Sequence, residues 1–203
     1  MNYQQNKEIP DLSKIRTYSK KKSNYLIERS SKRRQCRIEK FLTEAEAADV
    51  TPNFAVTIVW HALQTAGDRH DGHILGMQAA KRQEHLMRKI RTLAKQLGFS
   101  AVYVWVTSVG AKMGDHLHMA LHWRHTASLD LVNLLQQILG SDVDHEADVN
   151  RRHVARSCCR GWEIKEIVCG LSGALRWGRY MASQQFKHQD NSTGRRMGVS
   201  LRL

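Results

Sequence analysis

The chain has 203 residues, of which 41% are hydrophobic and 25% charged, so it contains enough apolar side chains to build one folded domain. The net charge of +13 and a sequence pI near 9.9 are typical of proteins that bind a polyanion, and they favour nucleic acid over an anionic membrane. No segment approaches the roughly 20 apolar residues of a membrane helix, and residues 1–14 lack the apolar region of a signal peptide. We therefore expect a cytoplasmic, nucleoid-associated protein with no membrane partner.

The positive charge is concentrated near the amino terminus. Residues 1–40 contain 12 Lys or Arg and four Asp or Glu, a surplus of +8, without sustained apolar periodicity. We expect residues 1–50 to form a basic extension outside the core, in which Thr43 and Glu46 have the spacing of a capping box. The extension is either a solvated tail or a clamp on DNA phosphates that gains affinity through counterion release. Its candidate DNA contacts are Lys20, Lys21, Lys22, Arg33 and Arg34.

Residues 51–203 are expected to form one domain with alternating strands and helices. Runs of β-branched and aromatic residues predict strands, and an apolar stripe such as Leu86, Ile90, Leu93 and Leu97 predicts an amphipathic helix. The expected strands are 54–60, 101–107, 114–123 and 162–168, and the expected helices are 75–97, 129–139 and 171–187, with a helical turn near 151–156. The order β-α-β-β-α-β-α predicts an α+β fold, with an antiparallel sheet, helices over one face and a ferredoxin-like outline.

The strand expected over residues 114–123 has two chemically different faces. Because side chains alternate along a strand, His116, His118 and His122 share one face, and the apolar residues between them share the other. Two histidines separated by one residue can hold the same divalent ion, whereas His122 is about 13 Å from His118 and too far to join them. The alternative interpretation is a polar strand face without a ligand.

A family resemblance rests on this strand. His116-Leu117-His118 resembles the His-hydrophobic-His motif of HUH endonucleases, which include rolling-circle replication initiators, relaxases and single-tyrosine transposases, and the similarity covers roughly residues 54–198. The resemblance implies that a central strand carries the motif and that both histidines hold Mg or Mn. It also implies that a tyrosine on a later helix attacks a phosphate of single-stranded DNA. The products are a 5′-phosphotyrosine and a free 3′-OH.

Tyr180 is the candidate nucleophile. Three of the other tyrosines lie in the basic extension, and Tyr103 lies on an expected strand. Helical spacing predicts that Tyr180, Ser183, Gln184 and Lys187 share one stripe, in which Lys187 is a candidate catalytic cation. Because an unperturbed tyrosine has a pKa of about 10, a nearby cation, Lys187 or Arg179, is needed to favour the phenolate. The alternative interpretation of Tyr180 is a residue at the rim of the core.

The third metal ligand has two candidates. Gln184 resembles the glutamine that completes the metal site of single-tyrosine transposases. The other option in the family is an acidic residue near the end of the strand before the motif, where this chain has Ser108. Lysine stands at Lys187 rather than three residues after the tyrosine, which departs from the pattern of replication initiators. If neither option supplies a ligand, the metal site is degenerate.

These features favour a nickase and strand transferase that acts as the rolling-circle replication initiator of a plasmid or phage. A single-tyrosine transposase and a non-catalytic nucleic-acid-binding module are the alternatives. The expected partner is single-stranded DNA, with a hairpin implied by the family resemblance, and the chain is either a monomer or a homodimer. Further candidate DNA contacts are Arg179, Arg195 and Arg196.

Overall fold

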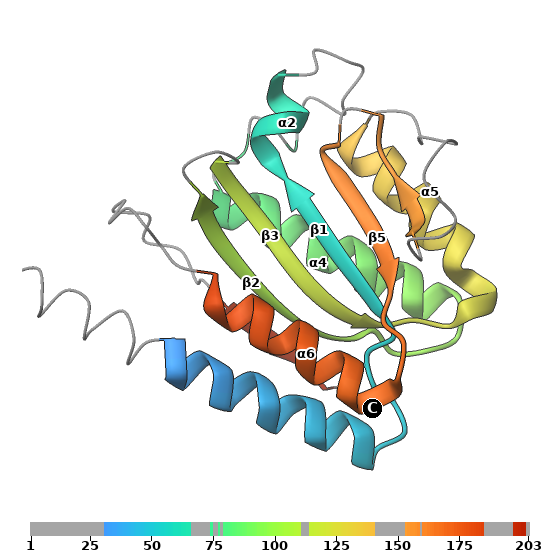
Figure 1. Cartoon of the computed structure of the whole chain (residues 1–203). Coiled ribbons are helices and arrows are strands. Elements are labelled where there is room, and N and C mark those ends of the chain that lie inside the picture. Colours follow the sequence, from blue (N-terminus) through green and yellow to red (C-terminus); the bar gives the residue numbers. More distant parts are fainter. Residues whose placement is uncertain are drawn as a thin grey trace, which may run out of the picture.

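The computed structural model describes residues 31–65, 74, 77, 79–110, 114–140, 153–158, 160–184 and 197–201. In this part of the chain the strands form one antiparallel sheet with the order β4-β5-β1-β3-β2-β6 (Figure 1). The strands are β1 (Phe54–Val59), β2 (Val102–Gly110), β3 (Gly114–His122), β4 (His153–Arg156), β5 (Trp162–Glu166) and β6 (Met197–Ser200). The helices are α2 (Trp60–Thr65), α4 (Ala79–Gln96), α5 (Ser128–Leu139), α6 (Gly170–Ser183) and the short η1 (His125–Ala127).

The α+β fold expected from the sequence is confirmed. The four inner strands lie in the order β5-β1-β3-β2, which is the ferredoxin-like arrangement, and β3 is central between β1 and β2. β2 and β3 form the expected hairpin, with Gly110 opposite Gly114. The apolar stripe that predicts a helix over residues 75–97 corresponds to α4, and the helix predicted over residues 129–139 corresponds to α5, which has Gly140 at its C-cap.

Helices cover both faces of the sheet, so the expectation that they lie over one face is wrong. α4 and α5 pack on one face, against odd-numbered residues of β3 such as Leu117 and Met119. α6 packs on the other face, where Ala120 of β3 contributes to a second apolar cluster (Figure 1). The second layer forms because this face of the sheet also carries apolar side chains, among them Val104, Val106 and Ala120, which α6 and its neighbours bury.

Residues 31–47 form a helix beside α6, which we call the N-terminal helix. Ile38, Phe41 and Leu42 are buried in the second apolar cluster, at the i, i+3, i+4 spacing of a helix face. Gly178 of α6 allows this close packing, since a Cβ atom there would lie 2.7 Å from Ile38 Cγ2. The expectation that residues 1–50 form an extension outside the core is therefore wrong for this helix, and the domain boundary near residue 50 stays a prediction.

The expected capping box is also wrong. Thr43 lies within the N-terminal helix, and its hydroxyl donates to Glu39 O at 3.0 Å rather than capping a helix start. Glu46 instead accepts a hydrogen bond from the Thr51 hydroxyl after the helix has ended. The two residues therefore lie in the last turns of a longer helix, and neither of them marks a helix start.

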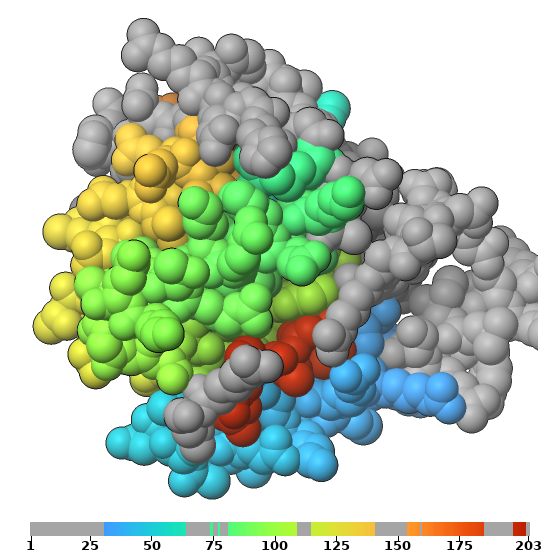
Figure 2. All heavy atoms as spheres, turned by 180° about the vertical axis from the view of Figure 1, so that it is seen from behind, coloured from blue at the N-terminus to red at the C-terminus, as the bar shows by residue number. Residues whose placement is uncertain are grey.

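Two strands at the edges of the sheet, β4 and β6, are not among the predicted strands. The helical turn predicted near residues 151–156 is wrong, because β4 pairs with β5 there. The basic segment near the carboxyl terminus contributes β6, which pairs with β2. Figure 2 shows β6 in dark red between α4 and the N-terminal helix. No helix in the described ranges is both long and apolar enough to cross a membrane.

Candidate functional site

His116 and His118 lie side by side on the face of β3 that α6 covers. Each is only 1% exposed, their ring centroids are 4.9 Å apart, and their planes meet edge to face at 81°. The alternation that directs Leu117 and Met119 toward α4 directs both imidazoles toward α6. The structure thus confirms that the two rings share a strand face and are close to each other.

Neighbouring strands supply one hydroxyl partner for each ring. β1 places Thr57 opposite His118, and Thr57 Oγ1 is 3.2 Å from His118 Nδ1. β2 places Ser108 opposite His116, and Ser108 Oγ is 2.6 Å from His116 Nε2. These partners follow from the strand register, so hydroxyl groups from both neighbouring strands set the orientation of the pair.

His118 has one ring nitrogen without a hydrogen-bond partner. Its Nε2 atom is buried and unpaired in the described part of the chain, while Nδ1 faces Thr57. Burial, together with the nearby His116, lowers the pKa of His118 to about 3, so its imidazole is neutral at physiological pH. When Nδ1 carries the proton, Nε2 presents a lone pair, which is the form of histidine that binds metal ions.

Tyr180 of α6 packs against His118, as the candidate site requires. The ring centroids of Tyr180 and His118 are 5.2 Å apart, although 62 positions separate them in the chain. Tyr180 is 40% exposed, so one side of its ring faces solvent while the other contacts the buried histidine. Burial of the contact side raises the pKa of the Tyr180 hydroxyl, which is therefore protonated at neutral pH.

Trp177 is a member of the site that the sequence analysis missed. Its ring stacks on Tyr180 with centroids 4.9 Å apart, and it also meets His118 at 5.7 Å. Its indole N–H donates to Met119 O at 3.1 Å, which fixes α6 over the motif strand. The i, i+3 spacing of Trp177 and Tyr180 on one helix was the signal that could have identified it.

The predicted stripe beyond Tyr180 is wrong as a helical feature. α6 ends at Ser183, whose hydroxyl donates to Tyr180 O at 2.7 Å, and Gln184 is already in an extended conformation. No hydrogen bond joins the Gln184 amide to either imidazole within the described residues. Its role as third ligand stays a prediction. Lys187, Arg195, Arg196 and Lys20 to Lys22 lie outside the described residues.

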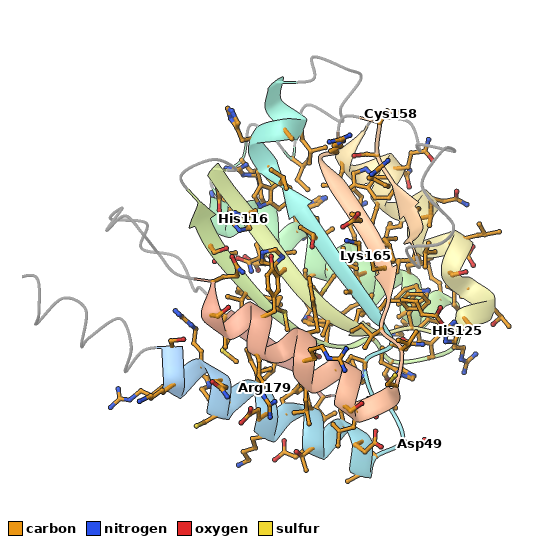
Figure 3. The ribbon with its side chains drawn as sticks, viewed as in Figure 1. Asp49, His116, His125, Cys158, Lys165 and Arg179 are labelled. Atoms are coloured by element: carbon orange, nitrogen blue, oxygen red, sulfur yellow. The ribbon has the colours of Figure 1, made fainter. Side chains whose placement is uncertain are left out.

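Arg179 faces the N-terminal helix. Its Nε atom is 3.3 Å from Glu39 Oε1, and Figure 3 shows it between α6 and that helix. Arg179 therefore does not act as the cation beside the Tyr180 hydroxyl in this arrangement. Arg33 is exposed on the N-terminal helix, and Arg34 donates to Ala182 O at 3.4 Å, which ties this helix to the end of α6.

His122 and the acidic residues do not complete the pair. His122 Nδ1 is 3.0 Å from Thr51 O at the far end of β3, as its distance along the strand predicts. Asp115 precedes His116, and strand alternation places it on the opposite face. No three His, Cys, Asp or Glu side chains cluster as a metal site in the described ranges. An acidic third ligand is thus not found in this part of the chain.

One feature of the two histidines and their partners fits a divalent ion. The unpaired Nε2 atom of His118 is a buried acceptor that gains a partner when it ligates an ion, which removes the cost of leaving it unsatisfied. The Thr57 contact to Nδ1 is the kind of outer partner that orients metal-bound histidine. His116 would join this set by exchanging its contact with Ser108.

Comparison of the chain with models of protein families, with curated proteins and with solved structures finds no match.

Proposed function

We propose that the protein is a metal-dependent nickase and strand transferase for single-stranded DNA, similar in chemistry to the HUH endonucleases. The observation that carries this proposal is the packing of Tyr180 against His118, with ring centroids 5.2 Å apart. A solvent-facing tyrosine and a buried pair of imidazoles, brought together from distant segments, match the nucleophile and metal ligands of that chemistry. The strongly basic chain suits a DNA strand as substrate.

Tyr180 is the nucleophile in this proposal. Its Oη atom attacks a backbone phosphorus, a new bond joins the tyrosine to the 5′-phosphate, and the bond from phosphorus to the 3′-oxygen breaks. The phenol proton passes through water to the leaving 3′-oxygen, which departs as a hydroxyl. Attack by a 3′-OH on the phosphotyrosine reverses these bond changes and rejoins a strand. Because burial raises the pKa of Tyr180, its proton must be lost as the attack proceeds.

His116 and His118 would hold Mg²⁺ or Mn²⁺, with Gln184 as the candidate third ligand. The bound ion would supply Lewis-acid polarisation of the scissile phosphate. Thr57 would keep the His118 ring in the orientation that directs Nε2 away from β1. Stacking of Trp177 on Tyr180 limits the positions that the nucleophile can adopt.

The biological setting within this proposal is replication of a plasmid or phage by a rolling circle, with single-tyrosine transposition as the alternative. One tyrosine in the described site fits a single cleavage followed by transfer of the strand. A hairpin in the DNA is expected from the family resemblance. The cations of the amino-terminal segment and of the segment near the carboxyl terminus would contact phosphates.

Formation of a covalent protein–DNA adduct tests the proposal. Incubation with single-stranded origin or transposon-end DNA and Mn²⁺ should yield an adduct on the peptide that contains Tyr180, detected by gel shift and mass spectrometry. Tyr180→Phe should abolish the adduct because the attacking oxygen is absent. His118→Ala should reduce its rate at least about 10-fold, since removing a ligand costs no less than removing an outer partner.

His125→Ala provides the matched control, because His125 is an exposed histidine on η1 at the other end of the motif strand. It should leave adduct formation within about twofold of the unmodified protein. Absence of an adduct with every metal and substrate, or an adduct that persists in Tyr180→Phe, would contradict the proposed chemistry.

A non-catalytic nucleic-acid-binding module is the second candidate function. The short contact between Ser108 Oγ and His116 Nε2, 2.6 Å, favours it because a nitrogen engaged with a hydroxyl is not available to an ion. Salt-sensitive DNA binding that is unchanged in Tyr180→Phe and His118→Ala, without an adduct, is the outcome expected for such a module. Ser108→Ala distinguishes the two candidates, since it should strengthen Mn²⁺ binding in the enzyme and change nothing in the module.

A further inference from the structure

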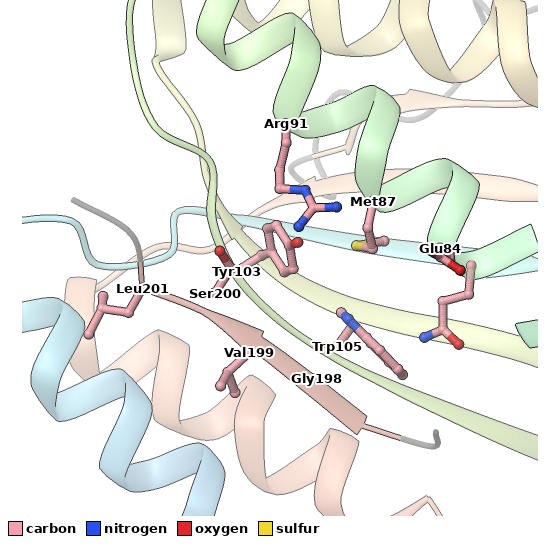
Figure 4. A pocket seen from close by; sticks show the side chains of 10 residues that line it. Glu84, Met87, Arg91, Tyr103, Trp105, Gly198, Val199, Ser200 and Leu201 are labelled. Carbon is pink, nitrogen blue, oxygen red and sulfur yellow. The ribbon is translucent and has the colours of Figure 1, made fainter. Parts of the chain in front are cut away.

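A cavity lies on the opposite face of the sheet from Tyr180. It has a volume of about 540 Å³ and is bounded by α4, β2 and β6 (Figure 4). This volume is within the range of small-ligand pockets, which is roughly 300–1,000 Å³. None of the residues proposed for DNA cleavage lines it, so the cavity is a separate feature of the fold.

The floor of the cavity is aromatic. Tyr103 and Trp105 alternate on β2 toward α4, and both are nearly buried, at 3% and 7% exposed. β6 passes close to the indole because it has glycine at Gly198, where a Cβ atom would lie 2.6 Å from Trp105 Cε2. The parts of these two rings that remain exposed form an apolar border of the cavity against which a planar ligand can pack.

Gln83 of α4 contributes an amide group that lacks a partner. The side chain lines the cavity and is 5% exposed, and its Nε2 atom is buried without a hydrogen bond in the described part of the chain. An unsatisfied buried amide N–H costs roughly 1–3 kcal/mol, and a ligand acceptor in the cavity would remove that cost. The amide therefore points to a ligand with hydrogen-bonding edges.

Arg91 places a positive charge at the rim. It lies eight residues after Gln83, which is close to two helical turns and puts both side chains on one side of α4. Figure 4 shows Arg91 extending toward Tyr103 over the same space. An exposed guanidinium beside an aromatic floor suits a ligand that joins a planar ring to an anionic group such as phosphate.

We propose that this cavity binds a nucleobase and its phosphate, with the ring against Tyr103 and Trp105, the base edge on Gln83 and the phosphate on Arg91. Adenine fits best, because its adjacent N6 donor and N7 acceptor match the two ends of a glutamine amide. The source is either a free nucleotide or one base of a DNA or RNA strand, which share this chemistry. The proposal does not depend on the nickase activity.

Calorimetric titration with adenosine 5′-monophosphate and with a thymidine oligonucleotide containing one central adenine tests the proposal, and adenosine without phosphate serves as a reference ligand. Gln83→Met removes the amide at similar volume and should weaken binding about tenfold, while the thermal midpoint stays the same or rises because no amide remains unsatisfied. Arg91→Gln should weaken binding of the monophosphate about tenfold and leave binding of adenosine unchanged. Lys95→Gln, an exposed cation one turn further along α4, is the matched control and should change neither.

The two ligands distinguish the source. Gln83-dependent binding of the monophosphate supports a free nucleotide site, and Gln83-dependent binding of the oligonucleotide alone supports a base of a strand. Binding that is equal in the unmodified protein, Gln83→Met and Arg91→Gln, or no binding of either ligand, overturns the proposal. Tyr180→Phe should bind both ligands normally, so a failure of the nickase proposal and a failure of this one are distinguishable.

Discussion

At the scale of single residues, the burial of His118 has a consequence for stability. The unfolded chain binds a proton at this histidine below its ordinary pKa of about 6.5, whereas the folded chain binds it near a pKa of about 3. Between these values the unfolded state holds more protons than the folded state. The free energy of unfolding therefore falls as the pH is lowered from about 6.5 toward 3, because folding must keep this ring neutral.

We expect His118 to contribute up to about 1.4 kcal/mol per pH unit to this loss of stability in acid. Urea denaturation of the chelator-treated protein at about pH 7, 6 and 5 measures the slope, and His118→Gln should make it smaller by that amount. His125→Gln, which removes an exposed histidine, should retain the slope of the unmodified protein. Parallel slopes for the unmodified protein and His118→Gln would show that folding does not lower the pKa of His118.

The residues of the candidate site were predictable to different degrees. His116, His118 and Tyr180 could be predicted because the strand alternation and the family resemblance can each be recognised within a short stretch of sequence. Thr57 and Ser108 were not predicted as partners, because they face the histidines through strand register, which depends on pairing between distant segments. Trp177 depends in the same way on how α6 docks over Met119.

At the scale of elements, the N-terminal helix is part of the folded core. Ile38, Phe41 and Leu42 are 0%, 3% and 0% exposed. Burying each such side chain contributes roughly 1.5–3 kcal/mol, and their sum is comparable to the ~5–15 kcal/mol that stabilises a typical domain. This helix was not predicted because its apolar stripe has few residues and is surrounded by many positively charged ones.

Truncation tests this role of the N-terminal helix. A chain that starts at residue 51 should lose most of its urea stability or fail to fold, because α6 and β2 would then expose the apolar surfaces that the helix covers. A chain that starts at residue 31 keeps the helix and should have a urea midpoint close to that of the full chain. Equal midpoints for the two truncations would contradict a structural role and support a dispensable extension.

The other strands and helices also differ in whether the local sequence or contacts with distant segments determine their structure. β1, β2, β3, β5, α4 and α5 were predicted within a few residues, because their apolar periodicity is strong. β4 and β6 have four residues each, too few to show a period, and they become strands because β5 and β2 offer unpaired edges. α6 ends at Ser183, earlier than the predicted helix, although no helix-breaking residue stands there in the sequence.

At the scale of the whole molecule, the exposed cations of the N-terminal helix lie on the same side of the sheet as Tyr180. Arg33 and Arg37 are exposed, and this helix runs beside α6 (Figure 3). A DNA strand that enters the candidate site from this side would release counterions from its phosphates. Each contact to a single strand adds about 0.7 to the slope of log affinity against log salt concentration.

Changing Arg33 and Arg37 to Gln should therefore reduce that slope by about 1.4 for single-stranded DNA. Fluorescence anisotropy over a range of salt concentrations measures it. Changing Lys89 and Lys95 to Gln removes the same charge from α4, on the opposite face of the sheet, and should reduce the slope less. If both double variants lower the slope equally, the strand does not follow the N-terminal helix.

The short edge strands have a final consequence for how copies of the protein meet. β4 and β6 have four residues each, whereas β2, which β6 covers, has nine. A four-residue edge offers few free backbone groups to a neighbouring chain, so it protects the sheet from adding strands of another copy. A proteolytic cut that removed β6 would uncover a long hydrogen-bonding edge. β6 therefore limits pairing between copies of the protein at this edge of the sheet.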